Sequence, residues 1–186
     1  MKIYNTLTRQ KEELVTLEPG VARIYACGPT VYNFIHIGNA RPLCVFDVLR
    51  RYLEWRGWQV RFVQNFTDID DKIIRRALEE KAGYEEIAAR YIREFWTDAK
   101  GLGVREATVH PKATENMDEI IAIISGLVEK GYAYAAPNGD VYFRTRKDPD
   151  YGKLSHQPVD DLESGARIDV SGQKAVSYTH LTLPTN

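Results

Sequence analysis

The sequence has few cysteines, no long apolar run and no excess of either charge, and each shortage excludes a class of protein. Two cysteines among 186 residues cannot form the disulfide framework that holds small secreted domains together. No stretch of about 20 apolar residues is present, so the sequence predicts no membrane span. The 25 Lys and Arg residues are balanced by 26 Asp and Glu, which argues against a basic DNA-coating protein. A local RNA-binding patch remains compatible with this balance.

The remaining composition is that of an ordinary globular protein. Hydrophobic residues make up 44% and charged residues 27%, which is typical of neither a disordered nor a membrane protein. A length of 186 residues suits one domain with a substantial buried core. The first residues contain neither an apolar signal region nor an Arg-rich presequence. We therefore expect a soluble, cytoplasmic protein.

The first half of the chain predicts strands and helices in alternation. Residues 21–27 are rich in β-branched and aromatic side chains and end at a Gly-Pro pair, which indicates a strand. Apolar residues then recur at helical spacing over 39–55, a second strand pattern covers 59–66, and a helix follows to about residue 82. Strand, helix, strand and helix in this order predict a parallel α/β unit of the mononucleotide-binding type.

The second half predicts helices followed by a hairpin. Two amphipathic patterns are followed by two short strand patterns around an Asn-Gly pair, which favours a tight turn. The expected helices cover 84–100 and 114–130, and the expected strands cover 132–134 and 141–143.

A candidate ligand site lies between the first strand and its helix, over residues 27–39. In open α/β sheets, ligands bind beyond the carboxyl ends of strands. Gly38 lets the backbone approach a ligand, and a helix that begins near Asn39 offers N–H groups and a positive dipole end to a phosphate. His36 can donate a hydrogen bond to a phosphate oxygen and stabilise a leaving pyrophosphate. On these residues alone, a surface histidine beside a helix start is the more economical interpretation.

The surrounding stretches resemble the class I aminoacyl-tRNA synthetases, whose first signature is His-Ile-Gly-His. Here the corresponding residues are His36-Ile37-Gly38-Asn39. Within that class, the chain is similar to the cysteinyl-tRNA synthetase family over residues 1–174. Five stretches carry the resemblance in the family's order: 4–9, 25–32, 65–72, 139–143 and 164–168.

The resemblance implies a fold class and a reaction. The fold class is α/β, the N-terminal half of a Rossmann-like class I catalytic domain with a helical and hairpin connective insertion. The reaction is ATP-dependent activation of L-cysteine to cysteinyl-adenylate, with Mg²⁺ accompanying ATP, and transfer to tRNA(Cys) by a monomeric enzyme. In that family a Zn²⁺ ion binds the substrate thiolate. This bond discriminates against serine, which a pocket that selects by shape alone distinguishes poorly from cysteine.

The resemblance also assigns residues by position. Cys27 matches the first zinc ligand, although a cysteine at a strand end is often simply buried. Cys44 is interpreted as a packing residue, and Asp68, Asp70 and Asp71 as favourable charges at a helix start. The cysteine-binding residues are Cys27, Gly28 and Thr67. The ATP-binding residues are Thr30, His36, Gly38 and Asn39, of which His36 and Asn39 are the catalytic ones.

Thr67 has a second interpretation, because it stands three residues before Asp70 at the spacing of a capping box. We therefore expect Thr67 to cap the helix that follows. Both roles are compatible.

Three features depart from the family pattern. Asn39 stands where the signature has its second histidine. Its side chain can donate a hydrogen bond but, unlike histidine, cannot carry a positive charge. The family's other zinc ligands, a Cys, a His and a Glu, are missing: no cysteine follows Cys44, and one thiolate falls short of the four ligands that zinc takes. The Lys-Met-Ser-Lys-Ser loop is also missing, since the only methionines are Met1 and Met117.

The last residues, 175–186, contain no Asp, Glu, Lys or Arg and complete no element. A parallel sheet that stops here would be open at one edge. We interpret 1–174 as a partial catalytic domain that is inactive by itself, and 175–186 as a disordered tail or vector read-through.

Three alternatives remain. The first is a cysteine:amino-sugar ligase of thiol biosynthesis, which shares the nucleotide signature. The second is a non-catalytic fragment that binds nucleotide or RNA. The third is a generic α/β nucleotide-binding domain, and the stretches 27–39 and 65–72 together argue against it.

The remaining histidines, His110, His156 and His180, have no partner at metal-ligand spacing. We expect His110 to lie in a loop and none of the three to bind a metal.

Overall fold

A computed structural model describes residues 1–137, 139–157 and 178–181. The chain divides into two compact units. The larger unit is Val15–Met117, and the smaller joins Met1–Leu14 with the residues from Asp118 onward. No helix in the described part of the chain is long and apolar enough to cross a membrane.

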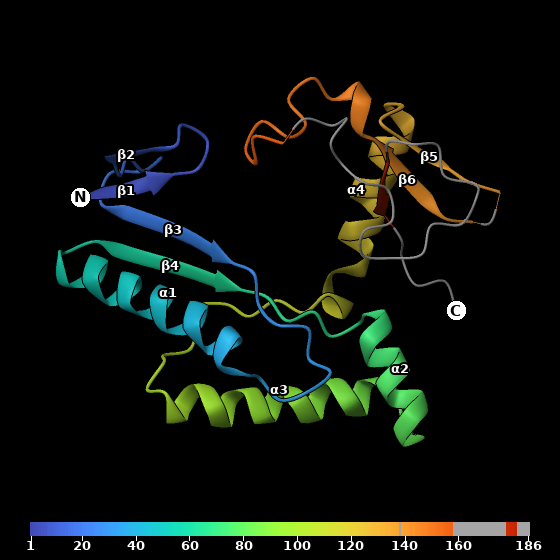
Figure 1. The fold of residues 1–186 in the computed structure, drawn as a ribbon, viewed down its shortest axis with the longest axis horizontal. Helices are drawn as coiled ribbons and strands as arrows, with labels where there is room; N and C mark the ends of the chain where they lie inside the picture. Colours follow the sequence, from blue (N-terminus) through green and yellow to red (C-terminus); the bar gives the residue numbers. More distant parts are fainter. Residues whose placement is uncertain (138, 158–177, 182–186) are drawn as a thin grey trace. The chain divides into compact units, whose positions relative to one another are not determined.

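The larger unit is built on a parallel sheet. Strands β3 (Val21–Ala26) and β4 (Gln59–Gln64) pair in parallel, and helix α1 (Ile37–Trp55) connects them and lies along the sheet (Figure 1). Phe46 of α1 stacks on Phe62 of β4, with ring centroids 6.0 Å apart. The predicted strand–helix–strand unit is therefore confirmed.

The other side of β4 is bordered by an extended run over residues 108–113. Val63 bridges Val109 in parallel, and Phe66 bridges Lys112 in the same sense. The Phe66 N–H donates to the carbonyl of Pro111 at 2.9 Å. The loop expected here is confirmed, since the segment forms no strand apart from these two isolated bridges, through which it adds a third extended run beside β4.

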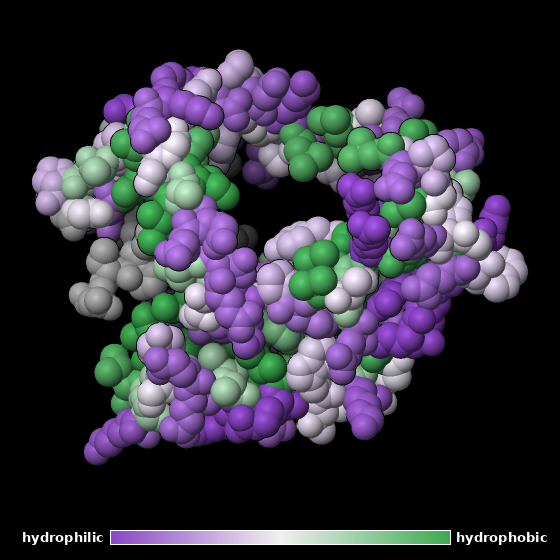
Figure 2. Space-filling model, turned by 180° about the vertical axis from the view of Figure 1, so that it is seen from behind, coloured by the Kyte–Doolittle hydropathy of each residue, from purple (hydrophilic) through white to green (hydrophobic). Residues whose placement is uncertain are grey.

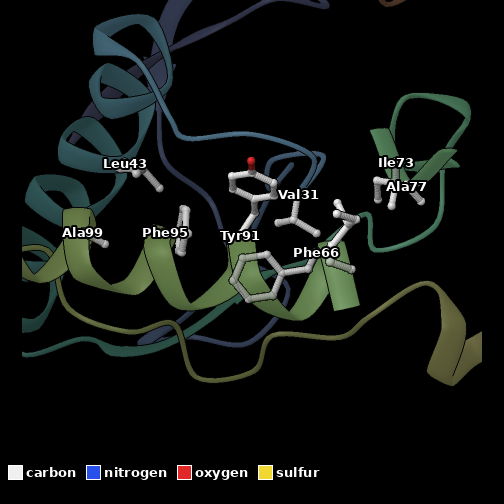
Figure 3. Packing of buried hydrophobic residues seen from close by; sticks show 10 residues of the cluster. Val31, Leu43, Phe66, Ile73, Ala77, Tyr91, Phe95 and Ala99 are labelled. Carbon is white, nitrogen blue, oxygen red and sulfur yellow. The ribbon is translucent and has the colours of Figure 1, made fainter. Parts of the chain in front are cut away.

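The core lies where the strand exits meet α1 and the two following helices, α2 (Asp71–Glu80) and α3 (Tyr84–Gly101). Phe66 packs edge-to-face on Phe95, with centroids 5.1 Å apart. Figure 3 shows side chains from the three helices converging on the strand-exit segments. The buried cluster comprises Val31, Leu43, Phe66, Ile73, Ala77, Ile87, Ala88, Tyr91, Phe95 and Ala99.

The smaller unit contains short antiparallel sheets and one helix. An N-terminal hairpin, absent from our expectations, is tied to the later part of the chain by His156, whose Nε2 lies 2.7 Å from the Thr6 carbonyl oxygen. The expected helix over 114–130 begins as a short 3-10 turn, Thr114–Asn116, before α4. The elements are β1 (Lys2–Asn5), β2 (Gln10–Glu13), α4 (Met117–Glu129), β5 (Ala133–Ala135), β6 (Val141–Arg144) and β7 (Tyr178–Leu181).

Strands β5, β6 and β7 form one antiparallel sheet in that order, which confirms the predicted hairpin of β5 and β6. Gly139 in the connecting turn has φ +90, a conformation that glycine adopts at little cost. Most of the predicted tail, and the stretch 164–168, lie outside the described residues.

Candidate functional site

The exits of β3 and β4 are held together beyond the ends of the strands. The Gly28 N–H donates to Asn65 Oδ1 at 2.8 Å, and the Val31 N–H donates to the Thr67 carbonyl at 3.2 Å. The Thr67 N–H returns a 3.2 Å hydrogen bond to the carbonyl of Pro29. A Cβ on residue 28 would lie 1.6 Å from the Asn65 carbonyl oxygen, so only glycine fits this approach.

Helix α1 begins with a capping box made by the signature residues themselves. His36 is the N-cap; its Nδ1 accepts from the Gly38 N–H at 3.0 Å, while Asn39 Oδ1 accepts from the His36 N–H at 3.2 Å. A Cβ on residue 38 would lie 2.7 Å from His36 Cε1, so glycine leaves room for the ring. Because Nδ1 is an acceptor here, a neutral His36 ring carries its proton on Nε2.

The capping box changes what the helix start offers to a ligand. The N–H groups of Asn39 and Ala40 donate to the His36 carbonyl, and the Gly38 N–H donates to the His36 ring. The free backbone donors expected from the sequence are therefore largely occupied by the box. Pro42, inside α1, has no N–H and cannot donate to the Gly38 carbonyl, which is thus without its usual helical partner.

A small cavity of about 70 Å³ joins the strand exit to the start of α1. Cys27 is exposed rather than turned into the core, and its Sγ lies 3.6 Å from the Gly28 carbonyl oxygen. The thiol and the helix start therefore share one pocket. The lining residues are Cys27, Gly28, Pro29, Asn39, Pro42, Leu43, Gln64 and Phe95.

The structure brings together most of the residues assigned from the sequence. Cys27, Gly28 and Asn39 line the cavity, and His36 and Gly38 adjoin it through the capping box. Thr30 and Thr67 face each other in a parallel bridge just beyond the strand ends, outside the cavity lining. The sequence did not identify several of the lining residues, which are Pro29, Pro42, Leu43, Gln64 and Phe95. Pro42, a proline inside a predicted helix, was the one unusual feature that could have pointed to this part of the cavity.

The acidic residues after β4 have different roles from each other. Asp70 is the N-cap of α2 and accepts from the Lys72 N–H at 2.9 Å, so the expectation that Thr67 caps this helix was wrong. Asp68 is buried and accepts from the backbone N–H of Thr114 at 3.1 Å and from its hydroxyl at 2.5 Å. Asp68 therefore anchors the chain after the third run, whereas we expected a charge at a helix start.

His110 lies outside the helices and strands, as expected, and has a structural role. Its Nε2 accepts from the Ala107 N–H at 2.9 Å, and its Nδ1 donates to the Gln64 carbonyl at 2.9 Å. The ring stacks on Phe66 and meets Trp96 edge-on, with centroids 5.4 and 4.7 Å away. Burial lowers the pKa of His110, because the interior disfavours the charged ring. Since Gln64 lines the cavity, His110 supports the cavity from behind.

The residues around Cys27 do not form a zinc site by themselves. Zinc takes about four N, S or O ligands, and Cys27 is the one thiol on the cavity wall. Within residues 1–137, 139–157 and 178–181, no group of three or more His, Cys, Asp or Glu side chains is placed to hold a metal. Cys44, expected to pack, is only partly buried on α1.

A parallel α/β unit with a polar helix start beyond its strand ends has the architecture of the mononucleotide-binding fold. A family model described as the catalytic domain of class I (C) tRNA synthetases matches residues 13–181. The chain belongs to this class I tRNA synthetase family, which confirms the resemblance read from its motifs.

Curated relatives agree with this family. A cysteine--tRNA ligase of Clostridioides difficile (strain 630) is 62% identical over 174 residues, which are 94% of this chain and 37% of the relative. A cysteine--tRNA ligase of Anoxybacillus flavithermus (strain DSM 21510 / WK1) is 57% identical over 174 residues, again 94% of this chain and 37% of the relative. The chain thus spans little more than a third of the length of these relatives. The family model reaches residue 181, so the domain boundary at 174 stays a prediction.

Proposed function

We propose that this chain is the nucleotide-binding part of a cysteine--tRNA ligase, which activates L-cysteine with ATP and transfers it to tRNA(Cys). Both curated relatives have this name. The observation that carries the proposal is the shared cavity, because a thiol at the tip of β3 and the signature residue Asn39 line the same space. An aminoacyl-adenylate needs its amino-acid end and its phosphate within one such pocket.

The start of α1 is the proposed site for the ATP phosphates. The Nε2–H of His36 is a donor for a phosphate oxygen, and Asn39 adds a side-chain amide whose N–H groups serve the same purpose. A phosphate oxygen can also take the Gly38 N–H from the His36 ring, which would free Nδ1. Negative charge then builds on the leaving pyrophosphate next to fixed donors, and Mg²⁺ accompanies the nucleotide.

The cavity beside Cys27 is the proposed site for the amino acid. Its wall combines Cys27 and Gly28 with the apolar residues Leu43 and Phe95. Gly28 forms the wall, held by Asn65, and Thr67 lies on the neighbouring exit. We propose that Cys27, Gly28 and Thr67 contact the substrate.

Cys27 is proposed as one zinc ligand, and the others would have to come from outside the described residues. A second thiolate, an imidazole or a carboxylate would complete the set that zinc prefers. When bound, the metal would select thiolate over hydroxyl. The 63% of sequence that the Clostridioides difficile relative has beyond the matched share offers room for these ligands.

A chimera tests the proposal most cleanly. It joins residues 1–174 of this chain to the remainder of the 62% identical relative, and the assay is cysteine-dependent ATP–pyrophosphate exchange. We expect exchange from the chimera and none from the 186-residue chain alone. In the chimera, His36→Ala should reduce kcat by about 10²-fold or more, as expected when a transition-state donor is lost.

His156→Gln is the matched control, because this exposed histidine lies in the smaller unit. Equal exchange by the His36 and His156 variants would contradict the proposed site. Transfer of cysteine from the adenylate to an amino sugar with release of AMP, without charging of tRNA(Cys), would favour the amino-sugar ligase instead.

A further inference from the structure

The surface of the chain is less informative than one polar group in its interior. Figure 2 shows hydrophobic patches separated by hydrophilic side chains on the face that it displays, which is ordinary for a globular protein. Inside the larger unit, by contrast, Gln64 is only 5% exposed. Glutamine is mostly found at the surface, and buried polar groups are normally hydrogen-bonded, so the burial of Gln64 needs an explanation.

Gln64 occupies a place that packing would otherwise give to an apolar side chain. Alternate residues of a strand face the same side of the sheet, so Phe62, Gln64 and Phe66 form one row. Phe62 packs on α1 and Phe66 packs on α3, which shows that the row faces the helices. The stem of Gln64 passes beside Gly28, since Gln64 Cγ lies 3.4 Å from the point where a Cβ of residue 28 would be.

The backbone of Gln64 is held in place, but its side chain is unpaired. The Gln64 N–H donates to the Val109 carbonyl at 3.1 Å, and its carbonyl accepts from His110 Nδ1 at 2.9 Å. The carboxamide forms no hydrogen bond with any of the residues that the structure describes. The other buried polar residues of the larger unit, Asp47 and Asp68, are both hydrogen-bonded. An unpaired buried amide costs free energy, and such a departure from good packing is expected where a ligand supplies the partner.

The unpaired carboxamide lines the cavity that we propose for the amino acid. Three of the lining residues have polar side chains, namely Cys27, Asn39 and Gln64, and none of the described lining residues is an Asp, Glu, Lys or Arg. Asn39 Oδ1 already accepts from the His36 N–H, so the Asn39 side chain offers donors to a ligand. Gln64 Oε1 is therefore the strongest side-chain acceptor that this cavity offers.

L-Cysteine has three polar groups of different chemistry to place in this cavity. Its carboxylate reacts with ATP and so belongs at the start of α1, where His36 and Asn39 lie. Its thiol lies beside Cys27 in the proposed function. The α-ammonium group remains, and it needs acceptors because it can only donate hydrogen bonds.

We infer that the Gln64 carboxamide binds the α-ammonium group of the amino acid, with Oε1 as the acceptor. This inference rests on the proposed function. It gives the pocket three points of attachment, at the thiol, the carboxylate and the ammonium group, and these fix the orientation of the substrate. Gln64 pairs with Ala26 of β3 on one side and with the run over 108–113 on the other, so its backbone is already ordered before the ligand binds.

A double-mutant cycle between enzyme and ligand tests the inference in the chimera. Gln64→Met removes the carboxamide and keeps an unbranched side chain, and 3-mercaptopropionate is cysteine without its ammonium group. Gln64→Met should raise KM for L-cysteine in the ATP–pyrophosphate exchange assay by about tenfold or more, because a hydrogen bond to a charged group is lost. The inhibition constant of 3-mercaptopropionate should change by less than about twofold, because this ligand has no group for Gln64 to bind.

Thermal unfolding of the 186-residue chain without ligand gives an independent measurement. Gln64→Met should keep or raise Tm, because it replaces an unpaired buried amide with an apolar side chain. The matched control is Gln59→Met at the exposed start of β4, which should change neither Tm nor either constant.

Three results would overturn the inference. If Gln64→Met lowered Tm by about 4 °C or more relative to Gln59→Met, the carboxamide would have a structural partner. If it changed the constants of cysteine and 3-mercaptopropionate equally, or changed neither, Gln64 would not contact the ammonium group. A parent chimera without cysteine-dependent exchange would contradict the proposed function and this inference with it, whereas the first two results leave exchange by the parent intact.

Discussion

Gly28→Ala is predicted to destabilise the larger unit. The added Cβ would lie 1.6 Å from the Asn65 carbonyl oxygen and 2.8 Å from its carbon. Since carbon and oxygen atoms normally approach no closer than about 3.2 Å, the two strand exits must separate by about 1.5 Å. That separation breaks the 2.8 Å hydrogen bond from Gly28 to Asn65 Oδ1, a loss of about 1 kcal/mol, and overpacking adds about 1–3 kcal/mol.

Part of this loss is offset, because alanine reduces the entropy of the unfolded chain by about 0.4–1 kcal/mol. We therefore expect a net loss of about 2–3 kcal/mol. The assay is urea unfolding followed by tryptophan fluorescence, since Trp55, Trp58 and Trp96 all lie in the larger unit. The midpoint should fall by about 1 M or more.

The matched control is Gly101→Ala at the end of α3, where a Cβ would meet open space. Its midpoint should stay the same or rise slightly, because alanine favours a helix. Equal midpoints for the parent and both variants would refute the close approach of the two strand exits.

Three further predictions concern the groups that hold the site. Asn65→Ala should lower the free energy of unfolding by about 1–2 kcal/mol because the Gly28 N–H loses its acceptor, and Asn65→Asp, which keeps that oxygen, should recover most of it. Asp68→Ala should lower the free energy of unfolding by about 2 kcal/mol, because the Thr114 N–H and hydroxyl would lose their shared acceptor. If it lowered this free energy no more than Asp150→Ala does at an exposed position, the anchoring role would be contradicted. Burial lowers the pKa of His110, so as the pH falls the unfolded chain takes up this proton before the folded chain does. The contribution of the neutral ring to the free energy of unfolding should therefore be fully present above about pH 6.5 and decrease as the pH falls towards the lowered pKa. His110→Gln should make this decrease shallower when unfolding is measured as a function of pH.

The parallel unit was predictable because its signals are local. The β-branched strand patterns of β3 and β4 and the helical spacing of α1 each fix one element, and their order fixes the parallel pairing. The third run, residues 108–113, has only two β-branched side chains, Thr108 and Val109, and contains Pro111. Proline is tolerated on an edge run, so tertiary pairing with β4 produced a strand-like segment where the sequence indicates a loop.

The site was partly predictable for the same reason. Cys27, Gly28 and Asn39 lie within one short segment, and the sequence places them together. Gln64 and Phe95 reach the same cavity from a different strand and a distant helix, which no local pattern reveals. The cap of α2 was misassigned because Thr67 and Asp70 both suit an N-cap, and the hydrogen bonds between Thr67 and the β3 exit decide between them.

The central claim is that the Cys27 thiol and the start of α1 belong to one pocket. A nitroxide spin label on Cys27, in a Cys44→Ser background, tests it through paramagnetic broadening of amide signals in solution. We predict strong broadening of the Gly38 and Asn39 signals and little at the Trp58 indole, about 20 Å away along the strands. Sharp Gly38 and Asn39 signals beside the label would contradict the account.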